Sequence, residues 1–135
     1  LTDVTGVQTC ALPISQGELN IVDYKATSTA SEISLDDEFK QSYKRQMEVY
    51  QWIFRKMGFK VSPVGYFVFA NALKDRKLFD NKLEFELTIL THQGDDSWVS
   101  PTLMDMKAIL ESDTIPEANP DCEYCEYRRL TKEVE

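Results

Sequence analysis

The chain has 135 residues, 42% of them hydrophobic, which suits one globular domain or the larger part of one. Its formal net charge of −8 argues against a broad basic surface for nucleic acid, unless metal ions or further chain compensate. No apolar run approaches the roughly 18 residues that a membrane span needs, so we expect no membrane contact. The few cysteines exclude a disulfide scaffold and suit a reducing compartment, which predicts a cytoplasmic protein.

The first residues do not resemble native protein. Residues 4–14 match the in-frame translation of a common short-read sequencing adapter. A signal peptide is the competing interpretation, but the segment has no basic start and its apolar stretch is interrupted. We therefore expect residues 1–15 to be an adapter-derived artefact. Residues 16–135 would then be the C-terminal part of a domain that lacks its N-terminal elements.

An apolar segment at residues 17–26 carries an acid and a lysine two positions apart. It predicts a buried strand, and because strand side chains alternate, Asp23 and Lys25 share one face. A carboxylate and an ammonium fixed side by side can hold a divalent metal ion and orient a water molecule. An ordinary surface salt bridge is the alternative. The same Asp-x-Lys spacing recurs at Asp75, Asp80 and Asp105. Only the first copy follows an apolar run.

A long helix is predicted next. Ser34 followed by Asp37 resembles a capping box, and Gly58 is a natural helix end. Between them, apolar and aromatic residues recur at three- and four-residue steps, which indicates one buried helix face. The members of this stripe are Phe39, Tyr43, Gln46, Tyr50, Ile53 and Met57.

Two polar groups lie within that helical stripe. An unpaired buried amide costs roughly 1–3 kcal/mol, so Gln46 needs a partner, and the hydroxyl of Tyr50 one turn later has the same need. We expect both side chains to point into a cleft lined by the strand that carries Asp23 and Lys25. Hydrogen bonds to backbone at the rim of the core are the alternative.

The remaining elements complete an α/β pattern. Residues 64–70 form a nearly continuous apolar run, typical of a strand covered on both faces, and residues 82–92 alternate as a strand with one wet face. A helix is predicted from Ser100, with proline in its first turn. Its expected buried residues are Leu103, Met106, Ile109 and Leu110. His92 is predicted to lie in a solvated loop. We expect a mixed β-sheet with the long helix packed across it.

Taken together, these motifs resemble the RecB-like branch of the PD-(D/E)XK nuclease superfamily. The resemblance rests on Ile-Val-Asp-Tyr-Lys at residues 21–25, on Gln46-x-x-x-Tyr50, and on a terminal C-x-x-C-x-Tyr at residues 122–127. It also rests on the apolar strand at residues 64–70 and the long-looped hairpin expected from it, the polar connection 74–81 and the strand at residues 82–92. It covers residues 17–130 and implies a restriction-endonuclease-like core that lacks its N-terminal elements.

The resemblance also implies roles for individual residues. Asp23 would be the acidic metal ligand, with the backbone carbonyl of Tyr24 as a further ligand to Mg²⁺ or Mn²⁺. Lys25 would orient the attacking water and stabilise charge on the phosphate. Gln46 and Tyr50 would lie beside the active site and help to position DNA.

The sequence departs from the family pattern in two places. The family's upstream aspartate, in a G-x-x-D context, and an upstream acidic or histidine ligand would both fall before residue 16. Because one carboxylate holds hydrated Mg²⁺ poorly, we predict that this chain is catalytically inactive although its parent is a deoxyribonuclease. In the C-x-x-C tail at residues 119–135, Cys122 and Cys125 match two of the four thiolates of a [4Fe–4S] cluster, and Thr131 stands where another is expected. A Zn²⁺ site in the parent and a vestigial pair are the alternatives.

Two classes of function follow from these observations. The first is a metal-dependent exonuclease of DNA recombination, repair or phage DNA processing, with fused or associated helicase or recombination proteins as partners. The second is a degenerate relative that keeps the fold as a nucleic-acid- or protein-binding module without cleavage. A metal-free structural protein would require Asp23 and Lys25 to point away from Gln46.

Overall fold

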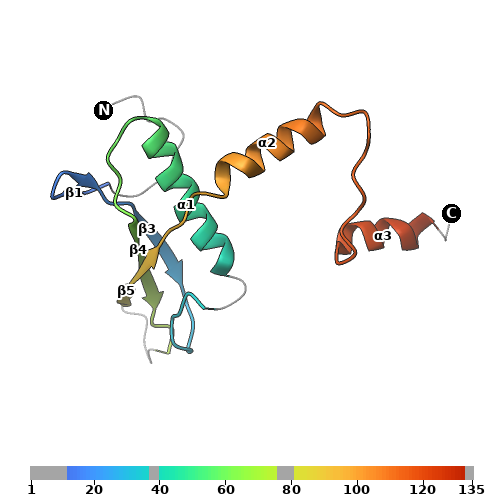
Figure 1. Cartoon of the computed structure of the whole chain (residues 1–135). Helices are drawn as coiled ribbons and strands as arrows, with labels where there is room; N and C mark the ends of the chain where they lie inside the picture. Colours follow the sequence, from blue (N-terminus) through green and yellow to red (C-terminus); the bar gives the residue numbers. More distant parts are fainter. Residues whose placement is uncertain (1–11, 37–39, 76–80, 133–135) are drawn as a thin grey trace. The chain divides into compact units, whose positions relative to one another are not determined.

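The computed structural model describes residues 12–36, 40–75 and 81–132 (Figure 1). The chain divides into two compact units, of which the first ends at Val99 and the second begins at Ser100.

The first unit is built on a three-stranded sheet in the order β3-β4-β5. β3 (Val22–Thr27) runs parallel to β4 (Val64–Ala72), and β5 (Phe85–Gln93) is antiparallel to β4. The helix α1 (Gln41–Lys56) connects β3 to β4, as a crossover between parallel strands requires (Figure 1). The prediction of a mixed sheet with a long helix packed across it is therefore confirmed.

The hydrophobic core lies between α1 and the sheet. Phe67 and Phe69 of β4 and Met47 and Phe54 of α1 are almost completely buried there. Burial of a large apolar side chain contributes about 1.5–3 kcal/mol, so these four residues fix the helix on this face of the sheet. Residues from the flanking segments complete the core: Leu19, Ile21, Leu35 and Val61.

The start of α1 differs from the prediction. The helix begins at Gln41, and its N-cap residue, Lys40, makes no side-chain capping hydrogen bond. The hydroxyl of Ser34 instead accepts the backbone N–H of Asp36 at 3.1 Å, in a local turn. The predicted capping box is therefore wrong, and its second member, Asp37, lies outside the described residues.

The buried side of α1 also differs from the predicted stripe. Its fully buried residues are Met47, Gln51 and Phe54, whereas Met57 is half exposed. The recurrence of apolar and aromatic residues does not predict the inward-facing amide of Gln51. The helix does end as predicted, since Gly58 has a φ of +90° and donates its N–H to the carbonyl of Arg55.

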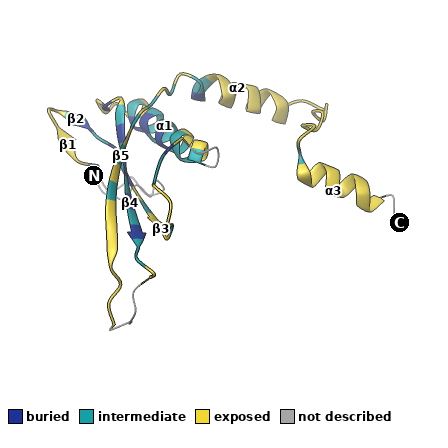
Figure 2. Cartoon of the chain, turned by 90° about the horizontal axis from the view of Figure 1, so that it is seen from below, coloured by how far each residue is buried: buried dark blue, intermediate teal, exposed yellow. Residues whose placement is uncertain are grey.

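The opposite face of the sheet is exposed (Figure 2). Leu87 and Ile89 of β5 are 67% and 65% exposed, and Tyr24 of β3 is also exposed. The alternation predicted for β5 is present, but its apolar side is the exposed one. The prediction that β4 is covered on both faces is wrong for the described residues, which cover one face. Alternation shows that two faces differ, but it does not show which face another layer covers.

The predicted strand at residues 17–26 is interrupted. A small antiparallel hairpin joins β1 (Ile14–Ser15) to β2 (Glu18–Leu19), and the chain then continues into β3. Its turn contains Gln16 and Gly17, both with positive φ. Ile14 and Ser15 of the predicted artefact thus pair with the segment that follows, and the adapter origin of residues 1–15 stays a prediction.

Two helices follow, α2 (Val99–Leu110), whose first residue is the last of the first unit, and α3 (Glu123–Lys132) in the second unit. The residues predicted to form a buried stripe on α2 are exposed, which makes that prediction wrong for the described chain. They are Leu103, Met106, Ile109 and Leu110. The sequence did not predict α3, which follows directly on Cys122. Among the described residues, no helix is long and apolar enough to cross a membrane.

Candidate active site

Four polar side chains from β3 and α1 lie together on the helix-facing side of the sheet. The Lys25 Nζ atom lies 2.8 Å from Asp23 Oδ2 and donates to Gln46 Oε1 at 2.9 Å. Gln46 Nε2 in turn donates to the Tyr50 hydroxyl at 2.7 Å. The metal-free structural alternative required Asp23 and Lys25 to lie away from Gln46, and this contact contradicts it.

Strand geometry explains why the acid and the lysine meet the helix. Asp23 and Lys25 are in register with Phe67 and Phe69, the two core residues of β4 that face α1. Because side chains alternate along a strand, Tyr24 points to the exposed face instead. The Ile21 carbonyl accepts the N–H of Tyr66 in β4, so by alternation the Tyr24 carbonyl points away from β4. No strand of the described chain pairs with that edge of β3.

The carboxylate of Asp23 is buried and incompletely satisfied. The residue is 4% exposed, and its Oδ2 atom has no hydrogen bond. The Lys25 ammonium is close enough for an ion pair with this oxygen but does not have hydrogen-bonding angles. A buried carboxylate oxygen without a hydrogen bond is costly, and a bound cation is one way to satisfy it.

The chemistry of the ammonium fixes the orientation of the Gln46 amide. An ammonium group only donates hydrogen bonds, so the amide oxygen must face Lys25 and the amide nitrogen must face Tyr50. The Tyr50 hydroxyl therefore accepts from Gln46, and its own proton can be donated to another group. Hydrogen-bond donation therefore runs in one direction, from Lys25 on β3 through Gln46 to Tyr50 on α1.

Tyr43 is a member of this site that the sequence analysis placed only in the core. The Lys25 Nζ atom lies 4.4 Å from the centroid of its ring, a cation–π contact. The ring packs at centroid distances of 6.4 Å from both Phe67 and Phe69, which hold it in place. Its position three residues before Gln46 on the same helix face was the signal that could have identified it.

We expect Tyr43→Leu to release the Lys25 ammonium and Tyr43→Phe to retain it. The aromatic ring, not the hydroxyl, attracts the cation, and the contact contributes about 0.5–2 kcal/mol. The measurement is the NMR shift of the Lys25 Hε protons, which the ring moves upfield. That displacement should disappear in Tyr43→Leu and persist in Tyr43→Phe. An unchanged Lys25 spectrum in Tyr43→Leu would show that the ring does not hold the ammonium.

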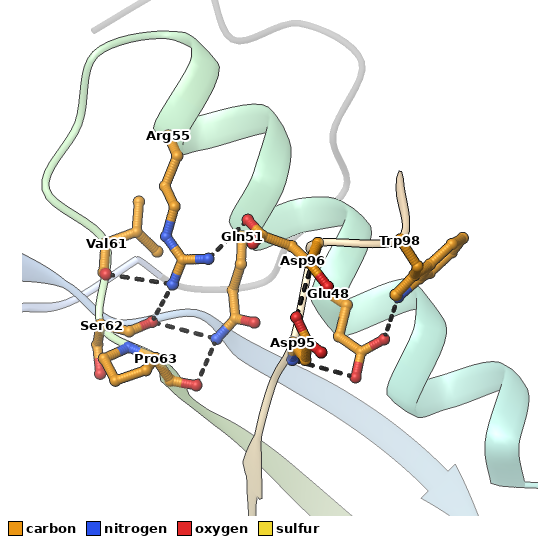
Figure 3. A network of polar contacts seen from close by, with 10 residues as sticks. Glu48, Gln51, Arg55, Val61, Ser62, Pro63, Asp95, Asp96 and Trp98 are labelled. Atoms are coloured by element: carbon orange, nitrogen blue, oxygen red, sulfur yellow. Dashed lines mark hydrogen bonds and ion pairs between the residues drawn. The ribbon is translucent and has the colours of Figure 1, made fainter. Parts of the chain in front are cut away.

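A second polar network fixes α1 to the segment after β5 (Figure 3). Glu48 accepts a hydrogen bond from Trp98 Nε1 at 2.7 Å, and its other oxygen lies 2.9 Å from His92 Nε2. His92 is in β5 and its side chain is 15% exposed, so the prediction of a solvated loop is wrong. Because β5 extends through Gln93, His92 lies inside the strand, on the same side as Leu90, which packs against the core.

Gln51 and Arg55 hold the loop before β4. The amide nitrogen of Gln51 donates to the carbonyls of Ser62 and Pro63 at 3.1 and 2.9 Å (Figure 3). Arg55 forms a 2.6 Å ion pair with Asp96. These contacts anchor the C-terminal half of α1 at two places. They therefore set the position of Gln46 and Tyr50 relative to β3.

The two cysteines of the second unit lie in contact. Cys122 Sγ and Cys125 Sγ are 2.8 Å apart, and the Cys125 backbone N–H is 3.3 Å from Cys122 Sγ. The hydrogen bond from the Cys125 thiol lowers the pKa of Cys122, and the same contact raises the pKa of Cys125. The backbone N–H favours a negative charge on Cys122, which then accepts from both groups.

A mixed sheet whose edge strand carries Asp-x-Lys, facing Gln-x-x-x-Tyr on the crossover helix, defines an α/β protein with a compact polar site. The profile of the PD-(D/E)XK nuclease superfamily matches residues 12–130. The chain belongs to this superfamily, and its mixed α/β structure is consistent with a restriction-endonuclease-like fold. Members are generally nucleases that use Mg²⁺ or Mn²⁺, so a nuclease-type function follows. No curated protein and no solved structure gives a significant match.

The site fits a divalent metal ion only in part. The Oδ2 atom of Asp23, buried and without a hydrogen bond, is a suitable ligand, and the Tyr24 carbonyl points to the open edge of β3. Within the described ranges, however, no group of three or more His, Cys, Asp or Glu residues could hold a metal. Further oxygen ligands would have to come from water, from DNA or from protein outside these residues.

Proposed function

We propose that this chain forms part of the catalytic domain of a metal-dependent DNA nuclease of the RecB-like branch. The specific role proposed is that of an exonuclease in DNA recombination, repair or phage DNA processing, with a fused or associated helicase or recombination protein. The observation that supports this function is the continuous series of polar contacts that runs from Asp23 through Lys25 and Gln46 to Tyr50. Cys122 and Cys125, the cysteines that the structure describes, are free thiols and suit the reducing cytoplasm.

Each residue of the series has a role in this proposal. Asp23 and the Tyr24 carbonyl would hold Mg²⁺ or Mn²⁺, which supplies charge neutralisation at the phosphate and a water of lowered pKa. Lys25, fixed by Gln46 and by the ring of Tyr43, can donate a remaining N–H to a phosphate oxygen or to the attacking water. The proton of Tyr50 can be donated to the DNA backbone.

The second candidate is a non-catalytic nucleic-acid- or protein-binding module of the same fold. The observation that favours it is the single carboxylate of the site, because Mg²⁺ sites use several oxygen ligands. We therefore propose that the 135-residue chain by itself has negligible nuclease activity. A complete set of metal ligands would restore nuclease activity.

The test is cleavage of labelled single- and double-stranded DNA by the protein that the complete reading frame encodes. We expect cleavage that requires Mg²⁺ or Mn²⁺ and that Lys25→Met lowers about 100-fold or more, because a charged donor to the transition state is lost. DNA binding should persist in the presence of Mg²⁺, which can replace the lysine beside Asp23. The matched control is Lys60→Met, a lysine 72% exposed and paired with Glu18, which should leave the rate unchanged.

Two outcomes would contradict these proposals. Binding of DNA without metal-dependent cleavage by the complete protein would favour the non-catalytic module. Efficient cleavage by the 135-residue chain that Lys25→Met abolishes would show that this chain carries a sufficient ligand set, and would overturn the proposed inactivity.

A further inference from the structure

A pair of reduced cysteines lies at the start of α3. Cys122 directly precedes the helix and Cys125 belongs to its first turn, where the backbone N–H groups of Cys125 and Glu126 both donate to the Cys122 carbonyl at 3.0 Å. These hydrogen bonds hold the two sulfur atoms 2.8 Å apart. Both thiols are free, Cys125 is exposed and Cys122 is partly exposed. Two accessible thiols are therefore fixed in mutual contact by the local fold.

The described residues do not supply a metal centre around this pair. A structural zinc site and an iron–sulfur cluster each need four ligands. No group of three His, Cys, Asp or Glu residues with metal-binding geometry occurs in the described parts of the chain. Two cysteines without further ligands are better suited to a covalent bond between their sulfur atoms.

A basic cavity adjoins the second cysteine. It has a volume of about 370 Å³ and is lined by Cys125, Arg128, Arg129 and Lys132. It is shallow and open to solvent, since all four lining residues are exposed, and its lining combines a thiol with three cationic side chains. Arg129 is partly neutralised by Glu126 at 2.6 Å, but the cavity remains net positive. Its charge and its sulfur complement a small anionic thiol or disulfide.

We propose that Cys122 and Cys125 form a reversible dithiol–disulfide pair that exchanges with a small anionic disulfide of the glutathione type. In the first step, one cysteine thiolate attacks the glutathione disulfide, forms a mixed disulfide and expels one glutathione thiolate. In the second step, the other cysteine attacks the protein-bound sulfur, closes the Cys122–Cys125 bond and expels the second glutathione. The protein loses two electrons and two protons, and both glutathione molecules leave as thiols.

The disulfide would link Cys122, the residue before α3, to Cys125 in the first turn of α3. This proposal is independent of nuclease activity, since it concerns only the second unit. It assigns to the C-x-x-C motif a chemistry that two cysteines can complete without further ligands.

The test uses the reduced full-length chain with Cys10→Ser, so that Cys122 and Cys125 are its only thiols, equilibrated with defined ratios of reduced to oxidised glutathione, then quenched and weighed by mass spectrometry. We expect a monomer that has lost two hydrogen atoms, and its reversal by excess reduced glutathione. Cys122→Ser and Cys125→Ser should each accumulate one stably bound glutathione, because the resolving thiol is absent. Retention of both free thiols under oxidising ratios, or purification of the chain with one equivalent of Zn²⁺ on these cysteines, would overturn the proposal.

Charge reversal tests the role of the cavity. The double variant Arg128→Glu/Lys132→Glu should react about fivefold more slowly with oxidised glutathione and at an unchanged rate with the neutral disulfide of 2-mercaptoethanol. The matched control is Lys107→Glu on α2, a charge reversal of an exposed lysine outside the cavity. Equal rates of the double variant and the wild type with oxidised glutathione would show that the cavity does not select an anionic partner.

Discussion

Replacing Lys25 with alanine is expected to destabilise the first unit by about 3–5 kcal/mol, because it leaves a buried carboxylate without its cation. Asp23 is 4% exposed, and the ammonium of Lys25 is its ion-pair partner at 2.8 Å. The loss is comparable to much of the total stability of a small domain. The measurement is urea unfolding of the 135-residue chain at constant pH, in the presence of a chelator so that no metal ion replaces the lysine.

Two further variants distinguish this cause from a general loss of packing. Lys60→Ala removes an exposed lysine of a surface ion pair and should cost less than about 1 kcal/mol. The double variant Asp23→Asn/Lys25→Ala removes both charges and should be more stable than Lys25→Ala alone. Asp23→Asn could instead lower the free energy of unfolding by the same amount in the Lys25→Ala background as in the wild type. In that case the buried charge would not be the cause.

Replacing Gly94 with alanine is expected to cost about 2–4 kcal/mol. An added Cβ would lie 3.0 Å from Cδ of Gln51 and closer still to Oε1. Gln51 is completely buried, and its amide holds the carbonyls of Ser62 and Pro63, so it cannot move aside without breaking those hydrogen bonds. Thermal or urea unfolding of the purified variant measures the loss.

The control for this prediction is Gly17→Ala. Gly17 has a φ of +77° and no atoms within 4 Å of an added Cβ, so only backbone strain of about 1 kcal/mol should appear. In Gly94→Ala/Gln51→Ala, the smaller side chain removes the clash, and the double variant should cost less than the sum of its single changes. Strict additivity would contradict the proposed clash.

Local sequence was sufficient for the elements that are regular over many residues. The apolar run of β4, the alternation of β5 and the helical pattern ended by Gly58 all depend on residues close together in the chain. The shared face of Asp23 and Lys25 also followed from the strand period alone. Because Gln46 and Tyr50 lie one turn apart, their mutual hydrogen bond is likewise a local property.

Tertiary structure decided which surfaces meet. Only the packing of α1 on β3 brought Lys25 to Gln46 and to the ring of Tyr43, contacts between segments about 20 residues apart. The inward amide of Gln51 and the pairing of His92 with Glu48 also escaped the sequence analysis, since a polar residue looks solvated until its partner is known. Periodicity shows that the two faces of a helix or strand differ in polarity. Which face is buried depends on the other parts of the chain that pack against it.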